Sequence, residues 1–187
     1  MTNVVIVVPD AGPLISLAKA DRLDLLTALG LPVYVMDQVY WEATRNRDKP
    51  DAMLIAEFVA ENSDLIHIAE TETGENARFA REGGRLGMRQ SSLGEAAISE
   101  FLTEFEVRFE DTAALLIYED SDFKRKRFVI PENVHVVSTK SFLYGLQDRK
   151  LVEDASAVWQ AIKAAGREPS EEEVDQPGQV QSSKTNW

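Results

Sequence analysis

The sequence contains no cysteine among its 187 residues. This absence excludes disulfide frameworks, thiolate metal sites and cysteine nucleophiles, and it fits a reducing, cytoplasmic setting. No apolar stretch reaches the roughly 18 residues that a membrane-spanning helix needs, and the N-terminus lacks the basic flank and cleavage pattern of a secretion signal. We therefore expect a cytoplasmic protein without a membrane segment.

Positive charge is also scarce, because 20 lysines and arginines stand against 32 acidic residues, for a formal net charge of −12. Electrostatic binding of nucleic acid over an extended surface normally needs that surface to be basic. Any such binding would have to be local, bridged by a metal ion or shared with a second subunit. The length and the 44% apolar content are those of one globular domain with a substantial core.

Two common functional motifs, one for nucleotide binding and one for nucleophilic catalysis, are missing. The first apolar run is followed by DAGPL in place of a glycine-rich GxGxxG turn, which weakens a Rossmann-like nucleotide-binding interpretation. No serine, histidine and acid arrangement suggests a nucleophilic hydrolase. The two histidines, His67 and His135, lie in strand-like apolar runs, where packing in a sheet is the more common role.

What the chain does contain is a regular alternation of strand-like and helix-like segments. Short apolar runs, expected to be strands, are followed by helical spacing of ten to fifteen residues, which favours βαβ units and an α/β fold with a mainly parallel sheet covered on both faces. The expected strands are residues 4–8, 31–36, 64–70, 113–118 and 134–138. Residues 70–92 are polar and glycine-rich, so a flexible loop or a short broken helix is expected there. We expect a folded domain over residues 1–165 and a flexible acidic tail over 166–187.

Isolated acidic residues occupy the ends of several of these elements. They are Asp10, Glu42, Glu95, Asp120 and Asp122. Carboxylates at the carboxyl ends of parallel strands lie where α/β sheets place their ligands. Several of them at one edge would repel each other unless a divalent cation were bound, and oxygen ligands suit Mg²⁺ or Mn²⁺.

Five segments carry a resemblance to a known family. In chain order they are DAGPLISLAKADRLDLL, PVYVMDQVYWEATR, LGEAAISEFL, ALLIYEDSDFKRK and VHVVSTKSFLYGL, and together they resemble the PIN-domain family of metal-dependent nucleases. The similarity covers roughly residues 4–150 and is greatest to VapC-type toxins of toxin–antitoxin systems and to related uncharacterised PIN-like proteins. It implies a PIN-like three-layer α/β/α fold. It also implies an endoribonuclease dependent on Mg²⁺ or Mn²⁺, the toxin of a type II pair, whose partners are RNA, a cognate antitoxin protein and a second copy of the chain.

The resemblance also assigns roles to residues. Asp10, Glu95 and Asp120 would hold the metal ion, Glu42 would complete the site or orient the attacking water, and Asp122 would assist. Glu119 could replace Asp120 under a one-residue shift. Arg45 completes an ExxR pattern with Glu42. Substrate binding is implied for Lys124, Arg125, Ser138 and Thr139.

Each signal also has an ordinary structural explanation. Asp10 could cap a helix, Glu42 and Arg45 could form a surface pair, and Glu95 would favour the helix dipole in any protein. The basic run at 124–127 could be a solvated turn.

The arginines at 78, 81, 85 and 89 could hold an RNA backbone, but nearby acids cancel their charge, so they are expected to be solvated. Their loop could instead cover the site. Trp41 is interpreted as a packing anchor. The alternative function is a catalytically weak PIN-like module that binds a protein partner.

Overall fold

The computed structural model describes residues 3–83, 92–109, 112–119 and 130–169. Five parallel strands form one sheet in the order β3-β2-β1-β4-β5. The strands are β1 (Asn3–Pro9), β2 (Val33–Met36), β3 (Ile66–Ala69), β4 (Thr112–Tyr118) and β5 (Val134–Ser138). Each lies within a residue or two of an expected strand, and the expected α/β fold with a parallel sheet is confirmed.

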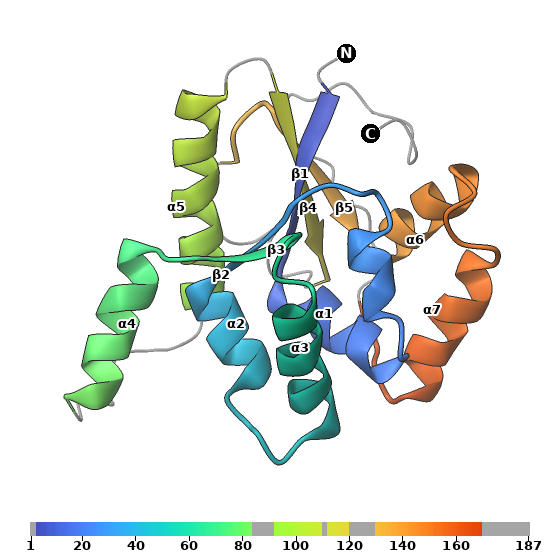
Figure 1. Cartoon of the computed structure of the whole chain (residues 1–187), viewed down its shortest axis with the longest axis horizontal. Helices are drawn as coiled ribbons and strands as arrows, with labels where there is room; N and C mark the ends of the chain where they lie inside the picture. The colour runs from blue at the N-terminus through green and yellow to red at the C-terminus, as the bar shows by residue number, and fades with distance from the viewer. Residues whose placement is uncertain (1–2, 84–91, 110–111, 120–129, 170–187) are drawn as a thin grey trace.

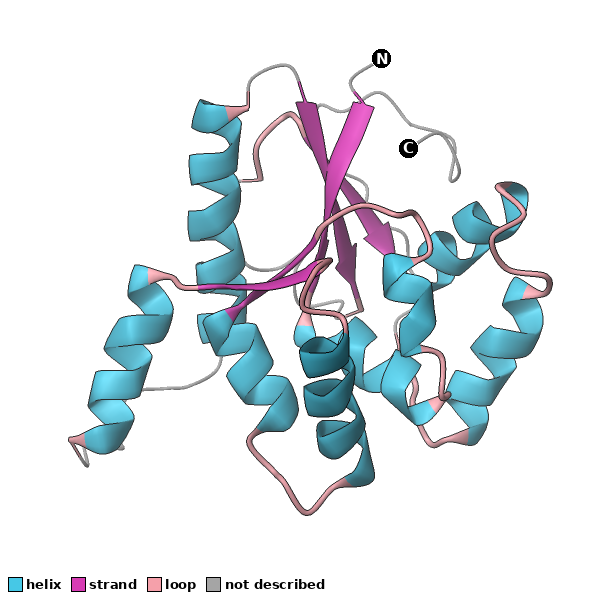
Figure 2. Ribbon diagram, viewed as in Figure 1, coloured by secondary structure: helices cyan, strands magenta, loops and turns pink. Residues whose placement is uncertain are grey.

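Helices cover both faces of this sheet, which gives the three-layer arrangement seen in Figures 1 and 2. Helix α5 lies on one side, and α1, α6 and α7 lie on the other (Figure 1). The helices are α1 (Ala11–Lys19), the 3-10 helix η1 (Leu23–Thr27), α2 (Asp37–Thr44), α3 (Pro50–Glu61), α4 (Glu72–Glu82), α5 (Leu93–Arg108), α6 (Thr139–Asp148) and α7 (Ala155–Ala164). Helix α3 packs against α1 and α2, and α4 packs mainly against α5.

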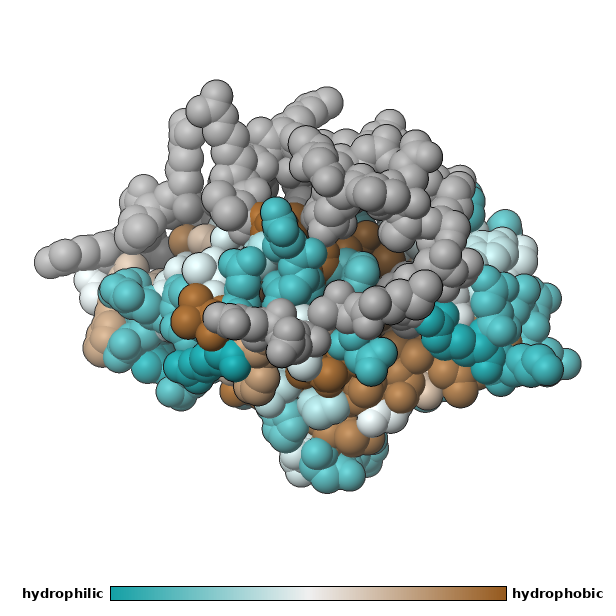
Figure 3. All heavy atoms as spheres, turned by 90° about the horizontal axis from the view of Figure 1, so that it is seen from above, coloured by the Kyte–Doolittle hydropathy of each residue, from teal (hydrophilic) through white to brown (hydrophobic). Residues whose placement is uncertain are grey.

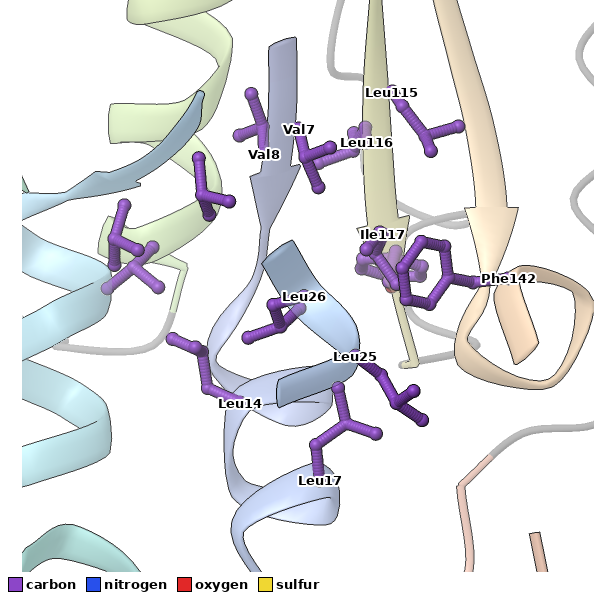
Figure 4. Close-up of a cluster of buried hydrophobic side chains, with 14 of the residues drawn as sticks. Val7, Val8, Leu14, Leu17, Leu25, Leu26, Leu115, Leu116, Ile117 and Phe142 are labelled. Carbon is purple, nitrogen blue, oxygen red and sulfur yellow. The ribbon is translucent and has the colours of Figure 1, made fainter. Parts of the chain in front are cut away.

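The core forms between the central strands and the helices that follow them. Val7 and Val8 of β1 lie beside Leu116 of β4, and all three are completely buried. Leu14 and Leu17 of α1 extend the same cluster, as Figure 4 shows. Strands that are buried on both faces need continuous apolar runs, which is why β1 and β4 do not alternate between apolar and polar residues.

The strand order places a topological switch point between β1 and β4. From β1 the chain builds the sheet outward through β2 and β3, whereas β4 and β5 extend it in the opposite direction. The loops that follow β1 and β4 therefore run apart. Open parallel sheets bind their ligands in the crevice that such a divergence leaves at the carboxyl ends of the strands.

Of the two alternatives expected for residues 70–92, the described part forms a short helix, α4, which has Gly83 as its C-cap. Its N-cap Thr71 accepts a hydrogen bond from the Gly74 amide at 2.9 Å. Glu100 of α5 accepts hydrogen bonds from the backbone amides of Glu72 and Thr73 at 2.6 and 3.1 Å. These tertiary contacts satisfy the first turn of the helix, which the polar local sequence did not indicate.

Large apolar side chains are exposed at scattered places on the described part of the surface. Figure 3 shows apolar and polar surface interspersed on one face, where the described residues are visible. The exposed large apolar side chains are spread over several elements and are Met53, Leu54, Ile68, Phe79, Val107, Phe109 and Leu151. Within the described ranges, no helix has both the length and the apolar character needed to cross a membrane.

Candidate active site

Strand register brings residues from distant parts of the chain to one edge of the sheet. Pro9 of β1 pairs with Ile117 of β4, and the Asp10 amide donates to the Ile117 carbonyl at 3.0 Å. Tyr118 of β4 pairs in turn with Ser138 of β5. Asp10 and Glu119, which follow paired strands, are therefore adjacent at the switch point.

Asp10 is surrounded by other carboxylates. Burial raises its pKa from 3.8 to about 7, a hydrogen bond from the Ala11 amide opposes that rise, and the negative charges of Glu95, Glu42 and Glu119 add to it. Asp10 occupies the N-cap position of α1, but its side chain makes no capping hydrogen bond. Asp10 therefore stands at a helix-cap position, but its side chain does not cap the helix.

Glu42 and Glu95 reach Asp10 from α2 and α5. Glu42 accepts a hydrogen bond from Gln38 Nε2 at 2.9 Å. Burial raises the pKa of Glu42, as does the charge of Glu95, while hydrogen bonds from Gln38 and the Gly94 amide and the charge of Arg45 lower it. A side chain at Gly94 would place its Cβ 2.9 Å from Glu42 Oε2, so glycine allows the close approach of these two helices.

Glu119 is hydrogen-bonded through both of its carboxylate oxygens. It is buried, and its Oε1 accepts from Thr139 Oγ1 at 2.8 Å. Its Oε2 accepts from Ser16 Oγ and from Arg167 Nη2, both at 2.8 Å. Arg167 Nε also donates to Ser16 Oγ at 3.0 Å. Since both oxygens are bonded within the protein, Glu119 is suited to holding the site together.

Ser138 and Thr139 lie at the start of α6, close to this network. Ser138 caps the helix by accepting from the Ser141 amide at 3.0 Å. Thr139 is 1% exposed and donates to Glu119. This placement favours a role in positioning the acidic group, so direct contact of either hydroxyl with substrate stays a prediction.

Four other residues expected at the site lie outside the described residues. They are Asp120, Asp122, Lys124 and Arg125. Their parts in metal and substrate binding therefore stay predictions. What the structure brings together is Asp10, Glu42, Glu95 and Glu119.

A divalent cation such as Mg²⁺ requires several oxygen donors close to one point. In the described ranges, no three acidic or histidine side chains are grouped closely enough to hold an ion by themselves. Burial is the main cause of the raised pKa of Asp10, and the negative charges of Glu95, Glu42 and Glu119 add a smaller rise, which a cation would relieve. Mg²⁺ commonly binds through one or two carboxylates and keeps several waters. Asp10 with Glu95 fits that requirement.

Arg81 is a site neighbour that sequence reasoning missed. It was expected to be a solvated charge, but its Nη1 donates to Gln38 Oε1 at 3.0 Å, and its guanidinium lies 3.9 Å from the centre of the Trp41 ring. Arg45 lies 5.1 Å from the same ring. Partial burial lowers the pKa of Arg81, while the charges of Asp37 and Glu42 raise it. Nothing in the local sequence indicated a contact between positions 43 residues apart.

Arg167 was also missed as a site residue, because it falls in the segment expected to be a flexible tail. Its side chain is 30% exposed and reaches the Glu119 carboxylate. The domain boundary at residue 165 stays a prediction, but ordered contacts with the domain continue at least to Arg167.

Comparison with known families agrees with this geometry. Residues 6–83 match the family model of a PIN domain. The match runs from β1 through α4 and includes Asp10 and Glu42. Together with the five-stranded parallel sheet, the match supports membership of the PIN-domain family. The chain matches none of the curated proteins with which it was compared.

Proposed function

We propose that this protein is an endoribonuclease dependent on Mg²⁺ or Mn²⁺ and that it is the toxin of a type II toxin–antitoxin pair. The observation that carries the proposal is the convergence of Asp10, Glu42 and Glu95, from three separate elements, at the switch point of a parallel sheet. PIN domains are generally nucleases, and the family match supports that chemistry here.

The proposed role of each residue follows from its contacts. Asp10 and Glu95 would hold the metal ion, which when bound would neutralise phosphate charge and supply a water that ionises near neutral pH. Glu42 is held by Gln38 and the Gly94 amide, and in this proposal it would orient the attacking water or accept its proton. Asp120 and Asp122 stay candidates for completing the site.

The neighbouring network keeps these groups in place. Glu119 joins α1 through Ser16 and α6 through Thr139, and Arg167 offsets its charge. A fixed frame of this kind reduces the reorganisation that the reaction would otherwise require.

Cleavage of a labelled RNA in the presence of Mg²⁺ or Mn²⁺ tests the proposal. Asp10→Asn and Glu95→Gln should each abolish cleavage and the rise in melting temperature that Mn²⁺ causes in the wild type. Glu104→Gln is the matched control, because Glu104 lies on α5 like Glu95 but is paired with Arg108 at the surface. Cleavage of wild-type strength by Asp10→Asn or Glu95→Gln would contradict the proposal.

A catalytically weak module that binds a protein partner is the second candidate. The lack of a three-carboxylate metal group among the described residues favours it. That function predicts a folded wild type that neither cleaves RNA nor gains thermal stability from Mn²⁺. An antitoxin and a homodimer are the partners proposed by resemblance, and co-expression with the product of an adjacent small gene would test the first of them.

A further inference from the structure

Two arginines from different helices meet on one aromatic ring beside the carboxylate site. Trp41 lies on α2, Arg45 follows the end of that helix, and Arg81 lies in the last turn of α4. The Arg81 guanidinium is 3.9 Å from the ring centre and that of Arg45 is 5.1 Å from it. The two guanidiniums are therefore within about 9 Å of each other, and each is within cation–π range of the ring.

Neither arginine is ion-paired to a carboxylate among the described residues, although Glu42 acts on both of them through its charge. None of the ion pairs between described residues includes Arg45 or Arg81. The contacts of Arg81 with Gln38 and with Trp41 involve neutral groups. Arg45 is exposed and Arg81 is partly exposed. In a chain of net charge −12, these are two neighbouring guanidiniums with no ion-paired carboxylate among the described residues, although the charges of Asp37, Glu42 and Glu82 act on Arg81.

This pair is connected directly to the carboxylate site. Arg81 donates to Gln38 Oε1, and Gln38 Nε2 donates to Glu42 Oε1 at 2.9 Å. Trp41 precedes Glu42 in the sequence. A nucleic-acid strand with one phosphate at the carboxylates would therefore have a neighbouring phosphate close to the arginines.

We propose that Arg45 and Arg81, held on the ring of Trp41, bind a backbone phosphate of a single nucleic-acid strand next to the scissile one. This inference rests on the proposed nuclease function. Guanidinium groups recognise phosphate oxygens through two parallel hydrogen bonds. Contact with the ring restricts their motion before the ligand arrives, which lowers the entropy that binding must remove. The site also explains how an acidic protein can hold a polyanion beyond the metal ion.

Binding of a fluorescent single-stranded RNA, measured by anisotropy in EDTA so that no cleavage occurs, tests the site. Arg81→Gln and Arg45→Gln should each raise Kd about tenfold and reduce the dependence of log Kd on log salt by about one. Arg78→Gln is the matched control: Arg78 lies on the exposed side of α4, one turn from Arg81, and its loss removes the same charge. It should change Kd less than about twofold.

Three further measurements separate a phosphate site from a structural role. Arg81→Lys should recover part of the affinity, because it keeps the charge. Each substitution should weaken the binding of a DNA strand of the same sequence as much as it weakens the binding of RNA. A loss restricted to RNA would contradict a phosphate contact. Arg45→Gln leaves the Arg81–Gln38 bond in place, so it tests the site even if Arg81→Gln loosens α4.

The outcomes also separate this site from the nuclease proposal. RNA binding by the wild type, weakened in both variants, with no cleavage in Mg²⁺ or Mn²⁺ would contradict the nuclease and support the phosphate site. Cleavage by the wild type with unchanged Kd and KM in both variants would contradict the phosphate site alone. If Arg78→Gln and Arg81→Gln changed Kd equally, both changes would be explained by the loss of net charge alone. That result would also overturn the site.

Discussion

Arg167 Nη2 donates to Glu119 Oε2 at 2.8 Å, joining the residue that follows β4 to a residue beyond α7. The Glu119 side chain is 5% exposed and that of Arg167 is 30% exposed. A carboxylate this well buried needs a counter-charge or several donors to offset the cost of its burial. Arg167 supplies the charge, and Ser16 and Thr139 supply the further donors.

Removing this ion pair should destabilise the fold. Arg167→Met is expected to lower the free energy of unfolding by about 1–3 kcal/mol, less than for a fully buried pair because the arginine is partly exposed. Urea denaturation followed by circular dichroism measures the change. Arg108→Met serves as control, since its pair with Glu104 has side chains 71% and 60% exposed, and it should cost at most about 0.5 kcal/mol.

Chain ends placed on either side of Arg167 provide a second test of the same contact. A chain that ends at residue 169 should keep the stability of the full chain, and one that ends at residue 166 should lose as much as Arg167→Met. Equal stability of the two shortened chains would show that the contact contributes nothing measurable.

The stability of the metal-free protein should depend on the protonation of Asp10. Its pKa is raised from 3.8 to about 7 on folding, so the folded state binds more protons between these values. The free energy of unfolding should therefore fall as pH rises from about 4 to 7, by about 1–3 kcal/mol after allowance for the partial exposure of Asp10. Denaturant titrations in EDTA at several pH values measure this slope.

Asp10→Asn removes the titrating group and should flatten that part of the profile. It should also make the metal-free protein more stable than the wild type above pH 7, because a neutral amide replaces a repelled carboxylate. An unchanged slope in Asp10→Asn would assign the pH dependence to other groups.

Gly94→Ala should reduce activity more than stability. The added Cβ would lie 2.9 Å from Glu42 Oε2 and displace that carboxylate. A misplaced catalytic group commonly costs tenfold or more, so we expect kcat for RNA cleavage to fall by at least about tenfold. Thermal unfolding should change little, since alanine suits a helix better than glycine does. Gly83→Ala, at the end of α4, is the control and should leave kcat unchanged.

Gly74→Ala should loosen α4. The new Cβ would collide with the Asp37 carboxylate, which accepts a hydrogen bond from Thr71 Oγ1 at 2.8 Å. The collision is expected to cost about 1–3 kcal/mol. Hydrogen exchange should show faster exchange in α4 while β1 and β4 remain protected. Thr71→Val, which removes the hydroxyl but adds no clash, should give a smaller effect of the same kind.

The sequence predicted the strands well because each is a short, continuous apolar run, as fully buried parallel strands require. It also predicted that acids would follow strand ends, and the register confirms that Asp10 and Glu119 share an edge. It left open whether Glu119 or Asp120 is the relevant acid after β4. The structure assigns Glu119 to an internal network, and Asp120 lies outside the described residues.

The contacts that sequence could not supply are those between distant polar residues. Arg81 and Gln38 are 43 positions apart, and no local periodicity indicates their hydrogen bond. Arg167 stands in a polar segment, where composition favours a solvated tail, yet its partner is fixed by where β4 ends. Helix α4 was not predicted firmly because Glu100 of α5 supplies two bonds to its first turn.

The pairing of β1 with β4 has a consequence for biosynthesis. Strand β1 ends at Pro9, but its neighbour begins only at Thr112, so the centre of the sheet cannot close until more than half the polypeptide has left the ribosome. Asp10 and Glu119 meet only at that stage, and Arg167 joins them later still. A nascent chain would therefore carry no assembled pair of Asp10 and Glu119 until β4 has emerged from the ribosome.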